Sequence, residues 1–454
     1  MTLKSINPVD GSLIQSFEPW NRERTEQALA CAAQAAAAWA REPVQQRSQR
    51  LGAAAALLRE RRDKVARLMT TEMGKLIGEA RAEIDKCAWG CDFYAANAER
   101  FLADQPVETD AGRSFVAYQP LGAVLAVMPW NFPFWQVFRF AAPALAAGNV
   151  GLLKHASNVS LCALAIEDVF ADAGFPQGAF TALLVDTERV VDLVRDIRVR
   201  AVTLTGSEAA GRAVAGSAGE NLKKTVLELG GSDPFIVLDD ADLELTVEQA
   251  VRSRFQNAGQ SCIAAKRFIV TPAVADEFLE RFRQAVAALR PGDPLDESST
   301  LAPMARADLR DDLHEQVRDA LERGATPVTG CEPLSGDGYF YCPSILDGVK
   351  PDMRAYAEEL FGPVATVIRA RDEQDALAIA NESTFGLGGS VWTEDAQRGE
   401  RLARGLECGA AFVNGLVKSD PRLPFGGVKS SGYGRELSWH GIHEFVNVKT
   451  MWIR

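Results

Sequence analysis

The chain has 454 residues, of which 47% are hydrophobic and 24% charged, so it is long enough to form two or three domains with substantial cores. Its net charge of −12 at pH 7 argues against a nucleic-acid surface, because phosphate binding needs clustered Lys and Arg. No segment has the roughly 18 consecutive apolar residues of a membrane span, and the first residues lack a signal-peptide pattern. We therefore expect a cytoplasmic protein with no nucleic-acid and no membrane partner.

The first part of the chain is predicted to be helical. The spacing of apolar residues predicts helices over Thr25–Ala40, Arg50–Leu68 and Lys75–Phe101, which we expect to cover a sheet. From Gly122, short β-rich runs alternate with helical runs, which is typical of a parallel sheet covered on both faces. The predicted strands are Ala123–Val127, Val150–Lys154, Phe180–Val185 and Ala201–Thr205, and the predicted helices are Phe134–Ala147, Leu161–Ala173, Thr187–Arg195 and Ala209–Ala218.

A second alternating region follows Pro234. Its predicted strands are Phe235–Leu238, Phe268–Val270 and Val364–Ala370, and its predicted helices are Leu243–Asn257, Val274–Leu289, Asp308–Arg323 and Asp372–Ala380. The sequence therefore predicts an α/β fold with two Rossmann-like α/β domains that meet near Gly230–Ser232. Two extended runs, Arg113–Pro120 and Glu444–Trp452, fit neither domain. They are either strands at a subunit contact or ordinary edge strands.

The cysteines are spread along the chain without a metal-binding or disulfide pattern. None of the eight forms a C-x-x-C pair, and no Cys or His pair of matching spacing joins Cys87 and Cys91. We therefore expect reduced thiols and no metal.

One cysteine has a context that suggests catalysis. Cys262 lies among small residues in Gly259-Gln-Ser-Cys262, and Glu228 precedes the glycine-rich bend Gly230-Gly231. A thiol and a carboxylate supply a nucleophile and a base. The alternative is that Cys262 is a small buried hydrophobe and Glu228 binds backbone groups of the bend.

Several motifs in order resemble the aldehyde dehydrogenase superfamily, and within it most closely the short bacterial succinate semialdehyde dehydrogenases. They are Pro129-Trp-Asn-Phe-Pro133, Lys154, Thr205-Gly-Ser207, Glu228-Leu-Gly-Gly231, Gly259-Gln-Ser-Cys262, Glu358-Glu-Leu-Phe-Gly-Pro363 and Pro424-Phe-Gly-Gly427. The resemblance implies that residues 1–112 and 122–230 bind NAD(P), that 231–425 form the catalytic domain, and that 113–121 and 436–454 are oligomerisation strands of a homodimer or homotetramer.

The resemblance also implies catalytic roles. Cys262 forms a covalent adduct with an aldehyde, and Glu228 serves as base for the thiol and for the water that hydrolyses the thioester. The side chain of Asn131 and the backbone N–H of Cys262 form the oxyanion hole. Without the resemblance, Asn131 reads as a turn residue between prolines.

The cofactor site is expected at the turn Thr205–Gly211, where Gly206, Ser207 and Gly211 resemble a pyrophosphate loop. Lys154 resembles the lysine that binds the adenosine ribose. Ser157 replaces the glutamate of the NAD-preferring pattern and removes the repulsion of a 2′-phosphate, so both NAD and NADP are expected as cofactors. The remaining cofactor contacts implied by the resemblance are Trp130, Leu229, Glu359 and Phe361.

The predicted substrate-binding residues follow from the same resemblance. Arg139 lies about two helical turns after Asn131 and resembles an arginine that binds a distal carboxylate. Gln256 stands where some relatives have a second arginine, and Ser419 is expected to assist. Trp135 and Phe425 are expected to form pocket walls. Each of these side chains has the alternative of a surface or packing role.

The predicted function is NAD(P)-dependent oxidation of succinate semialdehyde to succinate through a thiohemiacetal and a thioester on Cys262. Four alternatives remain open. The chain is a dehydrogenase for another aldehyde, such as glutarate semialdehyde or a general aliphatic aldehyde; a cofactor-independent cysteine esterase or thioesterase; a CoA-acylating dehydrogenase; or a catalytically silent protein. Glu228 argues against CoA acylation, because a base for water favours hydrolysis.

Overall fold

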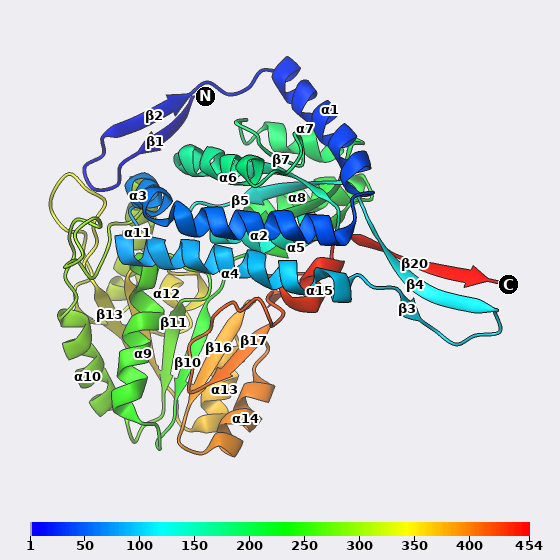
Figure 1. Cartoon of the computed structure of the whole chain (residues 1–454). Helices are drawn as coiled ribbons and strands as arrows, with labels where there is room; N and C mark the ends of the chain where they lie inside the picture. The colour runs from blue at the N-terminus through cyan, green and yellow to red at the C-terminus, as the bar shows by residue number, and fades with distance from the viewer. Residues whose placement is uncertain (1) are drawn as a thin grey trace.

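The computed structural model describes residues 2–454, which form two β-sheets flanked by helices and a projecting β-ribbon (Figure 1). The first sheet has the strand order β19-β9-β8-β5-β6-β7, and all its neighbours are parallel except β19. Its strands are β5 (Ala123–Met128), β6 (Val150–His155), β7 (Phe180–Ala182), β8 (Val199–Thr205), β9 (Lys224–Glu228) and β19 (Gly432–Tyr433). Its connecting helices are α5 (Trp135–Ala146), η1 (Ser157–Val159), α6 (Ser160–Asp172), α7 (Arg189–Arg195) and α8 (Glu208–Glu220).

The carboxyl ends of these parallel strands lie at one edge of the sheet. Met128 of β5 pairs with His155 of β6, and Thr205 of β8 pairs with Glu228 of β9. Open α/β sheets bind their ligands at this edge. The ends of β5, β6, β8 and β9, with the loops and helices that follow them, carry most of the predicted site residues, so the topology brings distant sequence segments together.

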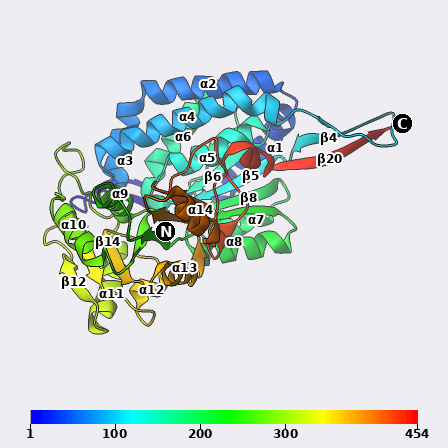
Figure 2. The same ribbon diagram turned by 90° about the horizontal axis from the view of Figure 1, so that it is seen from below.

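Four helices precede the first sheet, and α2 packs along α4, which in turn packs on α5 (Figures 1 and 2). They are α1 (Arg22–Trp39), α2 (Val44–Glu60), α3 (Arg62–Met73) and α4 (Ile77–Phe101). The prediction of one helix over Arg50–Leu68 is wrong, because Arg61 adopts a non-helical conformation that separates α2 from α3. The helical reading of the first residues is also wrong, since a hairpin of β1 (Leu3–Ile6) and β2 (Leu13–Phe17) precedes α1.

The second sheet has the order β12-β13-β14-β11-β10-β16-β17, with only β12 antiparallel to its neighbour. Its strands are β10 (Asp233–Val237), β11 (Ala265–Val270), β12 (Thr326–Thr329), β13 (Ser344–Asp347), β14 (Val364–Arg369), β16 (Gly388–Trp392) and β17 (Ala410–Val413). Its helices are α9 (Leu243–Phe255), η2 (Gln256–Gly259), α10 (Ala275–Ala287), α11 (Ala307–Glu322), α12 (Arg354–Ala357), α13 (Glu373–Asn381) and α14 (Ala396–Gly405). The α/β fold with two parallel-sheet units is confirmed, and the chain passes from one to the other between Glu228 and Asp233.

The chain then returns from the second sheet to the first. A short pair, β15 (Phe385–Gly386) with β18 (Val428–Lys429), precedes β19, whose Gly432 pairs with Glu228. Residues 436–454 were expected to be strands, but Ser438–His443 form helix α15, which packs on α4 and α5. Ile442 is buried there because the apolar side of this short helix closes the core beneath the sheet.

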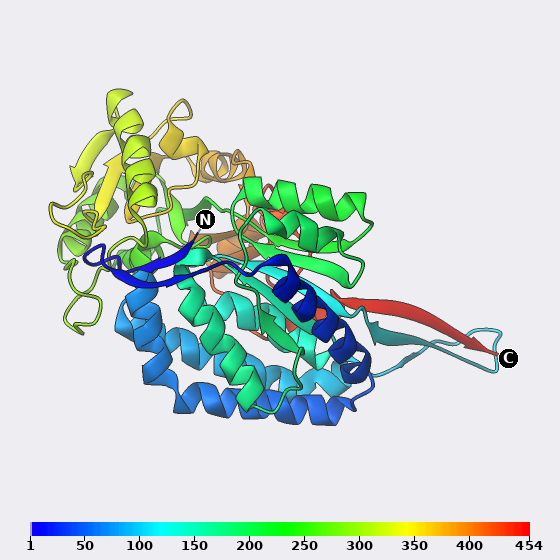
Figure 3. The same ribbon diagram turned by 90° about the horizontal axis from the view of Figure 1, so that it is seen from above.

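The β-ribbon extends away from both sheets (Figure 3). It consists of β3 (Gln105–Pro106), β4 (Arg113–Pro120) and β20 (Val446–Ile453), and every residue of β20 pairs with β4. The expected strands at 113–120 and near the C-terminus are therefore present. Between residues 2 and 454 no helix has both the length and the apolar content required to cross a bilayer.

Candidate active site

The loop that carries Cys262 has a backbone shape that only a few residues favour. Asn257, Ala258 and Gly259 have φ values of 54°, 52° and 72°, which turn the chain sharply after α9. Gly259 is required here, because a Cβ would lie 2.3 Å from the carbonyl oxygen of Gly362. Asn257 Nδ2 donates to the carbonyl oxygen of Asn131 at 2.9 Å. The cysteine loop is thereby fixed against the loop that follows β5.

Two buried cations, Arg254 and Lys266, donate hydrogen bonds to the backbone of the same loop. Arg254 donates to the carbonyl oxygens of Gly259, Leu360 and Gly362, and burial lowers its pKa to about 9. Lys266 Nζ donates to the carbonyl oxygens of Ser261 and Cys262, at 2.7 Å each. The sequence interpretation missed both residues, although two consecutive cations, Lys266 and Arg267, inside strand β11 are a detectable signal.

The Cys262 thiol is only partly accessible and is protonated at neutral pH. Burial raises its pKa to about 12, and the negative charges of Glu359 and Glu228 act in the same direction. The positive charges of Arg139 and Lys266 oppose this effect. A thiolate at this position therefore requires a base when the nucleophile attacks.

Glu228 ends β9, and its carboxyl group is not engaged by ordinary hydrogen bonds from the described residues. Its side chain is buried, and neither carboxylate oxygen has a hydrogen-bond partner of normal geometry within residues 2–454. Burial raises its pKa to about 8, while Arg139, Arg435 and the Gly427 amide only partly oppose this. A carboxylate that merely bound the backbone of the bend would have its oxygens occupied, so the geometry favours the catalytic reading.

Asn131 follows β5 and faces the cysteine loop. Its Nδ2 donates to the carbonyl oxygen of Gln260 at 3.0 Å, and its Oδ1 accepts from Gln136 Nε2 at 3.1 Å. These bonds fix the orientation of the amide and use one of the two Nδ2 protons. The other proton is free for a further acceptor.

The predicted cofactor residues gather at the carboxyl edge of the first sheet. Lys154 is the penultimate residue of β6, and its Nζ lies 3.4 Å from Thr187 Oγ1. Ser157 is exposed at the start of η1 and carries no charge. Gly206 and Ser207 begin α8, where Ser207 is the N-cap. This helix N-terminus and the uncharged serine suit a phosphate-bearing nucleotide.

The loop after β9 contributes a further predicted cofactor residue at the carboxyl edge of the first sheet. A Cβ at Gly211 would lie 2.7 Å from Leu229, so only glycine lets α8 approach this loop. The Trp130 and Phe361 rings meet edge to face, with centroids 5.9 Å apart. The structure thus places Leu229, Trp130 and Phe361 at the junction of the two sheets.

Glu359 connects the same region to the cysteine loop. Its Oε1 accepts from Lys266 Nζ at 2.9 Å and from the Gly231 amide at 3.0 Å. A Cβ at Gly230 would lie 2.6 Å from Glu359 Oε2, which explains the glycine pair after Glu228.

Arg139 is more enclosed than its predicted role in substrate binding suggests. Its Nε forms an ion pair with the carboxylate of Glu436, and the exposed fractions of the two side chains are 3% and 5%. Its guanidinium carbon lies 4.6 Å from the ring centroid of Phe425, and its Nη2 lies 3.4 Å from Thr205 Oγ1. The charge of Arg139 is therefore already balanced by Glu436, a residue that the sequence interpretation missed.

The other predicted substrate residues divide into two groups. Trp135 Nε1 donates to Ser419 Oγ at 3.0 Å, and both side chains are buried beside Arg139. Gln256, by contrast, is exposed at the start of η2 and makes no side-chain hydrogen bond within the described part of the chain. The structure brings Trp135, Ser419 and Phe425 together and leaves Gln256 at the surface.

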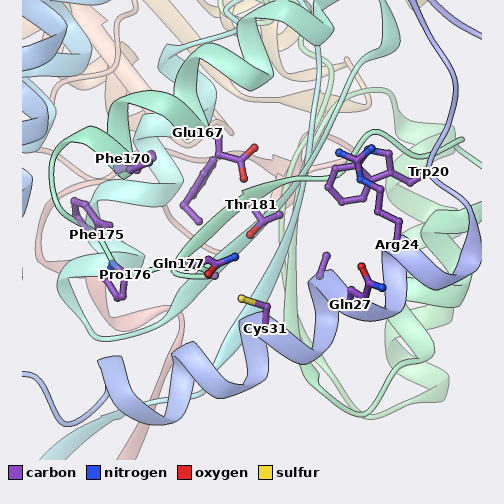
Figure 4. A pocket seen from close by; sticks show the side chains of 14 residues that line it. Trp20, Arg24, Gln27, Cys31, Glu167, Phe170, Phe175, Pro176, Gln177 and Thr181 are labelled. Atoms are coloured by element: carbon purple, nitrogen blue, oxygen red, sulfur yellow. The ribbon is translucent and has the colours of Figure 1, made fainter.

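A separate cavity of about 520 Å³ lies between α1 and α6 (Figure 4). Cys31 projects from α1 toward Gln177 and Thr181, and Glu167 lies on α6 at the other wall. Neither Cys262 nor Glu228 lines this cavity. These two side chains influence each other electrostatically, so any chemistry that they carry out together lies outside this cavity.

The Cys262 thiol, the buried Glu228 carboxylate and the oriented Asn131 amide thus lie where two parallel-sheet units meet. The chain belongs to the aldehyde dehydrogenase family, whose family model matches residues 1–451.

The chain is similar over its full length to individual family members. It is 52% identical to a probable succinate-semialdehyde dehydrogenase [NADP(+)] of Synechocystis sp., with 100% of both chains covered. It is 50% identical to the succinate-semialdehyde dehydrogenase [NADP(+)] of Mycobacterium avium, covering 100% of this chain and 97% of the relative. The crystal structure of succinic semialdehyde dehydrogenase from Streptococcus pyogenes in complex with NADP+ is 40% identical and superposes with a TM-score of 0.97, covering 99% of each chain.

Proposed function

We propose that this aldehyde dehydrogenase oxidises succinate semialdehyde to succinate with NADP+ as the preferred cofactor. The observation that carries the chemistry is the buried and unpartnered carboxylate of Glu228 within electrostatic reach of the Cys262 thiol. The substrate class is supported by the similarity to the two succinate-semialdehyde dehydrogenases. Trp135 and Ser419, hydrogen-bonded to each other beside the ammonium of Lys86, also suit a carboxylate-bearing aldehyde.

In the first step, Cys262 Sγ attacks the aldehyde carbon while its proton passes to a base, for which we propose Glu228. The C–S bond forms and the carbonyl becomes an alkoxide. The free Nδ2 proton of Asn131 and the backbone N–H of Cys262 would donate to this oxygen. Collapse of the alkoxide expels a hydride and leaves a thioester on Cys262.

The cofactor supplies the hydride acceptor when it is bound. Lys154, Ser157, Ser207 and Glu359 would hold it, because they line the carboxyl edge of the first sheet. Ser157 allows a 2′-phosphate, since no carboxylate stands at that position to repel it.

In the last step, Glu228 would accept a proton from water, which attacks the thioester carbon. The C–S bond breaks, the acid leaves, and Cys262 recovers a proton. Burial suits Glu228 to this role, because a base whose pKa is about 8 is stronger than an ordinary carboxylate.

We also propose that the β-ribbon is a subunit contact of a homodimer or homotetramer. Val448, Trp452 and Ile453 of β20 are 61%, 51% and 44% exposed, which is unusual for apolar side chains in an ordered strand. Light scattering of the full chain and of a variant with Val448→Asp and Trp452→Asp tests this. A monomeric wild type would refute it.

The function is tested by steady-state kinetics with succinate semialdehyde, glutarate semialdehyde and pentanal, each with NADP+ and NAD+. We expect the highest kcat/KM for succinate semialdehyde with NADP+. Cys262→Ala should abolish activity. Equal turnover of pentanal and the semialdehydes would refute carboxylate specificity, and ester hydrolysis that continues without cofactor would favour a cysteine hydrolase.

A further inference from the structure

Lys86 is a cation without a carboxylate partner beside the predicted substrate pocket. It lies on α4, partly buried, with Nζ 2.7 Å from Ser419 Oγ and 4.6 Å from the ring centroid of Trp135. Within residues 2–454 it forms no ion pair with Asp or Glu. A buried or half-buried lysine is usually paired, so this arrangement requires an explanation.

The carboxylates nearest to Lys86 are committed elsewhere. Glu83, on the same helix, forms a buried ion pair with Lys75 and accepts from the backbone amides that begin α5. Asp420 forms an ion pair with Arg422 at 2.6 Å. Each of these negative charges is balanced by a different cation, so the charge of Lys86 remains available for a ligand.

The Ser419 hydroxyl is oriented by its two donors. Lys86 Nζ and Trp135 Nε1 both donate to Ser419 Oγ, at 2.7 and 3.0 Å. A hydroxyl oxygen accepts two hydrogen bonds and donates one. Because both acceptor positions are used, the Ser419 proton is left to donate to a further acceptor. An ammonium and a hydroxyl donor thus occupy adjacent positions.

Arg139 connects this pair to the nucleophile. Its charge acts on Lys86, on Cys262 and on Glu228, so the guanidinium lies within electrostatic range of the Lys86 pair and of both of these residues. Since Glu436 balances Arg139, the unbalanced positive charge at this end of the pocket belongs to Lys86. A distal anionic group on an aldehyde would complement this charge.

We propose that Lys86, together with the hydroxyl of Ser419, binds the distal carboxylate of the aldehyde substrate and determines specificity for ω-semialdehydes. This inference rests on the proposed function and deepens it. Trp135 confines the ammonium on one side, and Ser419 holds it from the other. Burial and the charge of Arg139 lower the pKa of Lys86 to about 8, and a bound carboxylate would offset both effects.

The experiment compares wild type, Lys86→Met, Lys86→Gln and Lys86→Arg with NADP+ and either succinate semialdehyde or pentanal. We expect kcat/KM for the semialdehyde to fall about tenfold or more in the Met and Gln variants, because a charge-assisted hydrogen bond is lost. This fall in kcat/KM should come mainly from a higher KM for the semialdehyde. The value for pentanal should stay within about twofold, and Lys86→Arg should recover most of the semialdehyde activity.

Lys418→Met is the matched control, because Lys418 is an exposed lysine next to Ser419. It removes the same charge without removing the contact to Ser419, and we expect unchanged kinetics. An equal effect of Lys86→Met on both substrates, or an equal effect of Lys418→Met, would overturn the assignment. A wild type that does not prefer the semialdehyde overturns the proposed function itself. A wild type that prefers it, with variants that keep this preference, overturns only the role of Lys86.

Discussion

The ammonium of Lys266 lies 2.9 Å from the carboxylate of Glu359 and 2.7 Å from the carbonyl oxygen of Cys262. One side chain therefore joins the nucleophile's loop to a residue expected to contact the cofactor. The charge of Lys266 also counteracts the burial that raises the pKa of the Cys262 thiol. The cysteine and the cofactor region are thus coupled before any ligand binds.

Lys266→Met should slow alkylation of Cys262 several-fold at pH 8. The reason is that the pKa of Cys262 rises further when this positive charge is removed, so less thiolate is present. Mass spectrometry of iodoacetamide-labelled protein measures the rate. Cys31, partly exposed on α1, provides the internal control and should react at the wild-type rate. An unchanged Cys262 rate would contradict the coupling.

Glu228→Gln should remove the deacylation step and its pH dependence. In wild type, turnover should rise with pH through about 8, because the raised pKa keeps Glu228 protonated and inactive as a base below that value. The variant should lose about a hundredfold or more in kcat and show no inflection there. Stopped-flow absorbance should show that reduced cofactor forms more slowly even in the first turnover, because Glu228 is also the proposed base for Cys262. A full steady-state rate in the variant would exclude Glu228 as the base.

Arg139→Met should destabilise the protein because it leaves the carboxylate of Glu436 buried without a partner. Loss of one member of a buried ion pair costs about 3–5 kcal/mol. Urea unfolding of Arg139→Met, Glu436→Gln and the double variant measures this. We expect the double variant to lose less than the sum of the two single losses. Additive losses would mean that the two side chains do not stabilise each other.

Ser157→Glu should convert the cofactor preference. A carboxylate after Lys154 would repel the 2′-phosphate of NADP+ and accept a hydrogen bond from the ribose hydroxyl of NAD+. We expect kcat/KM with NADP+ to fall about tenfold or more, since like charges brought together cost several kcal/mol. The value with NAD+ should hold or rise, and Ser157→Gln is the uncharged control. Equal losses with both cofactors would assign Ser157 to structure.

The preference for succinate semialdehyde over pentanal should decline above pH 8. Lys86 carries its charge only below its pKa of about 8. Titration of Glu228 changes kcat/KM for both substrates alike, so it does not change the ratio of the two values. The groups that face Lys86 are Glu83 and Cys87 on α4, Arg139 on α5 and Asp420 in the loop after β17. The ratio of kcat/KM for the two substrates, measured from pH 6 to 10, tests this expectation. A constant ratio would show that Lys86 does not titrate during binding.

The features that the sequence predicted correctly are those that depend on the local pattern of residues. The strands of the first sheet follow from their apolar runs. The carboxyl ends of these strands carry Lys154 and Glu228, and the loops after them carry Asn131 and Ser207, to one edge because parallel strands share an orientation. Cys262 was recognised from its neighbours in the chain.

Contacts between remote segments could not be predicted in the same way. Lys86 meets Ser419, and Arg139 meets Glu436, across very large sequence separations. Neither lysine nor glutamate in a helix or loop signals burial by itself, since both residue types usually face solvent. The hairpin β1–β2 was missed because its strands are short and alternate only weakly between buried and exposed positions.

The two bonds from Lys266 also determine which way the nucleophile's own peptide group faces. The carbonyl of Ser261 points at Lys266, and in a trans peptide the N–H of the next residue points in the opposite direction. The Cys262 amide is therefore turned away from the lysine. A buried cation beside the loop thus fixes the orientation of the peptide group, so the fold sets the direction of the Cys262 N–H dipole before any ligand binds.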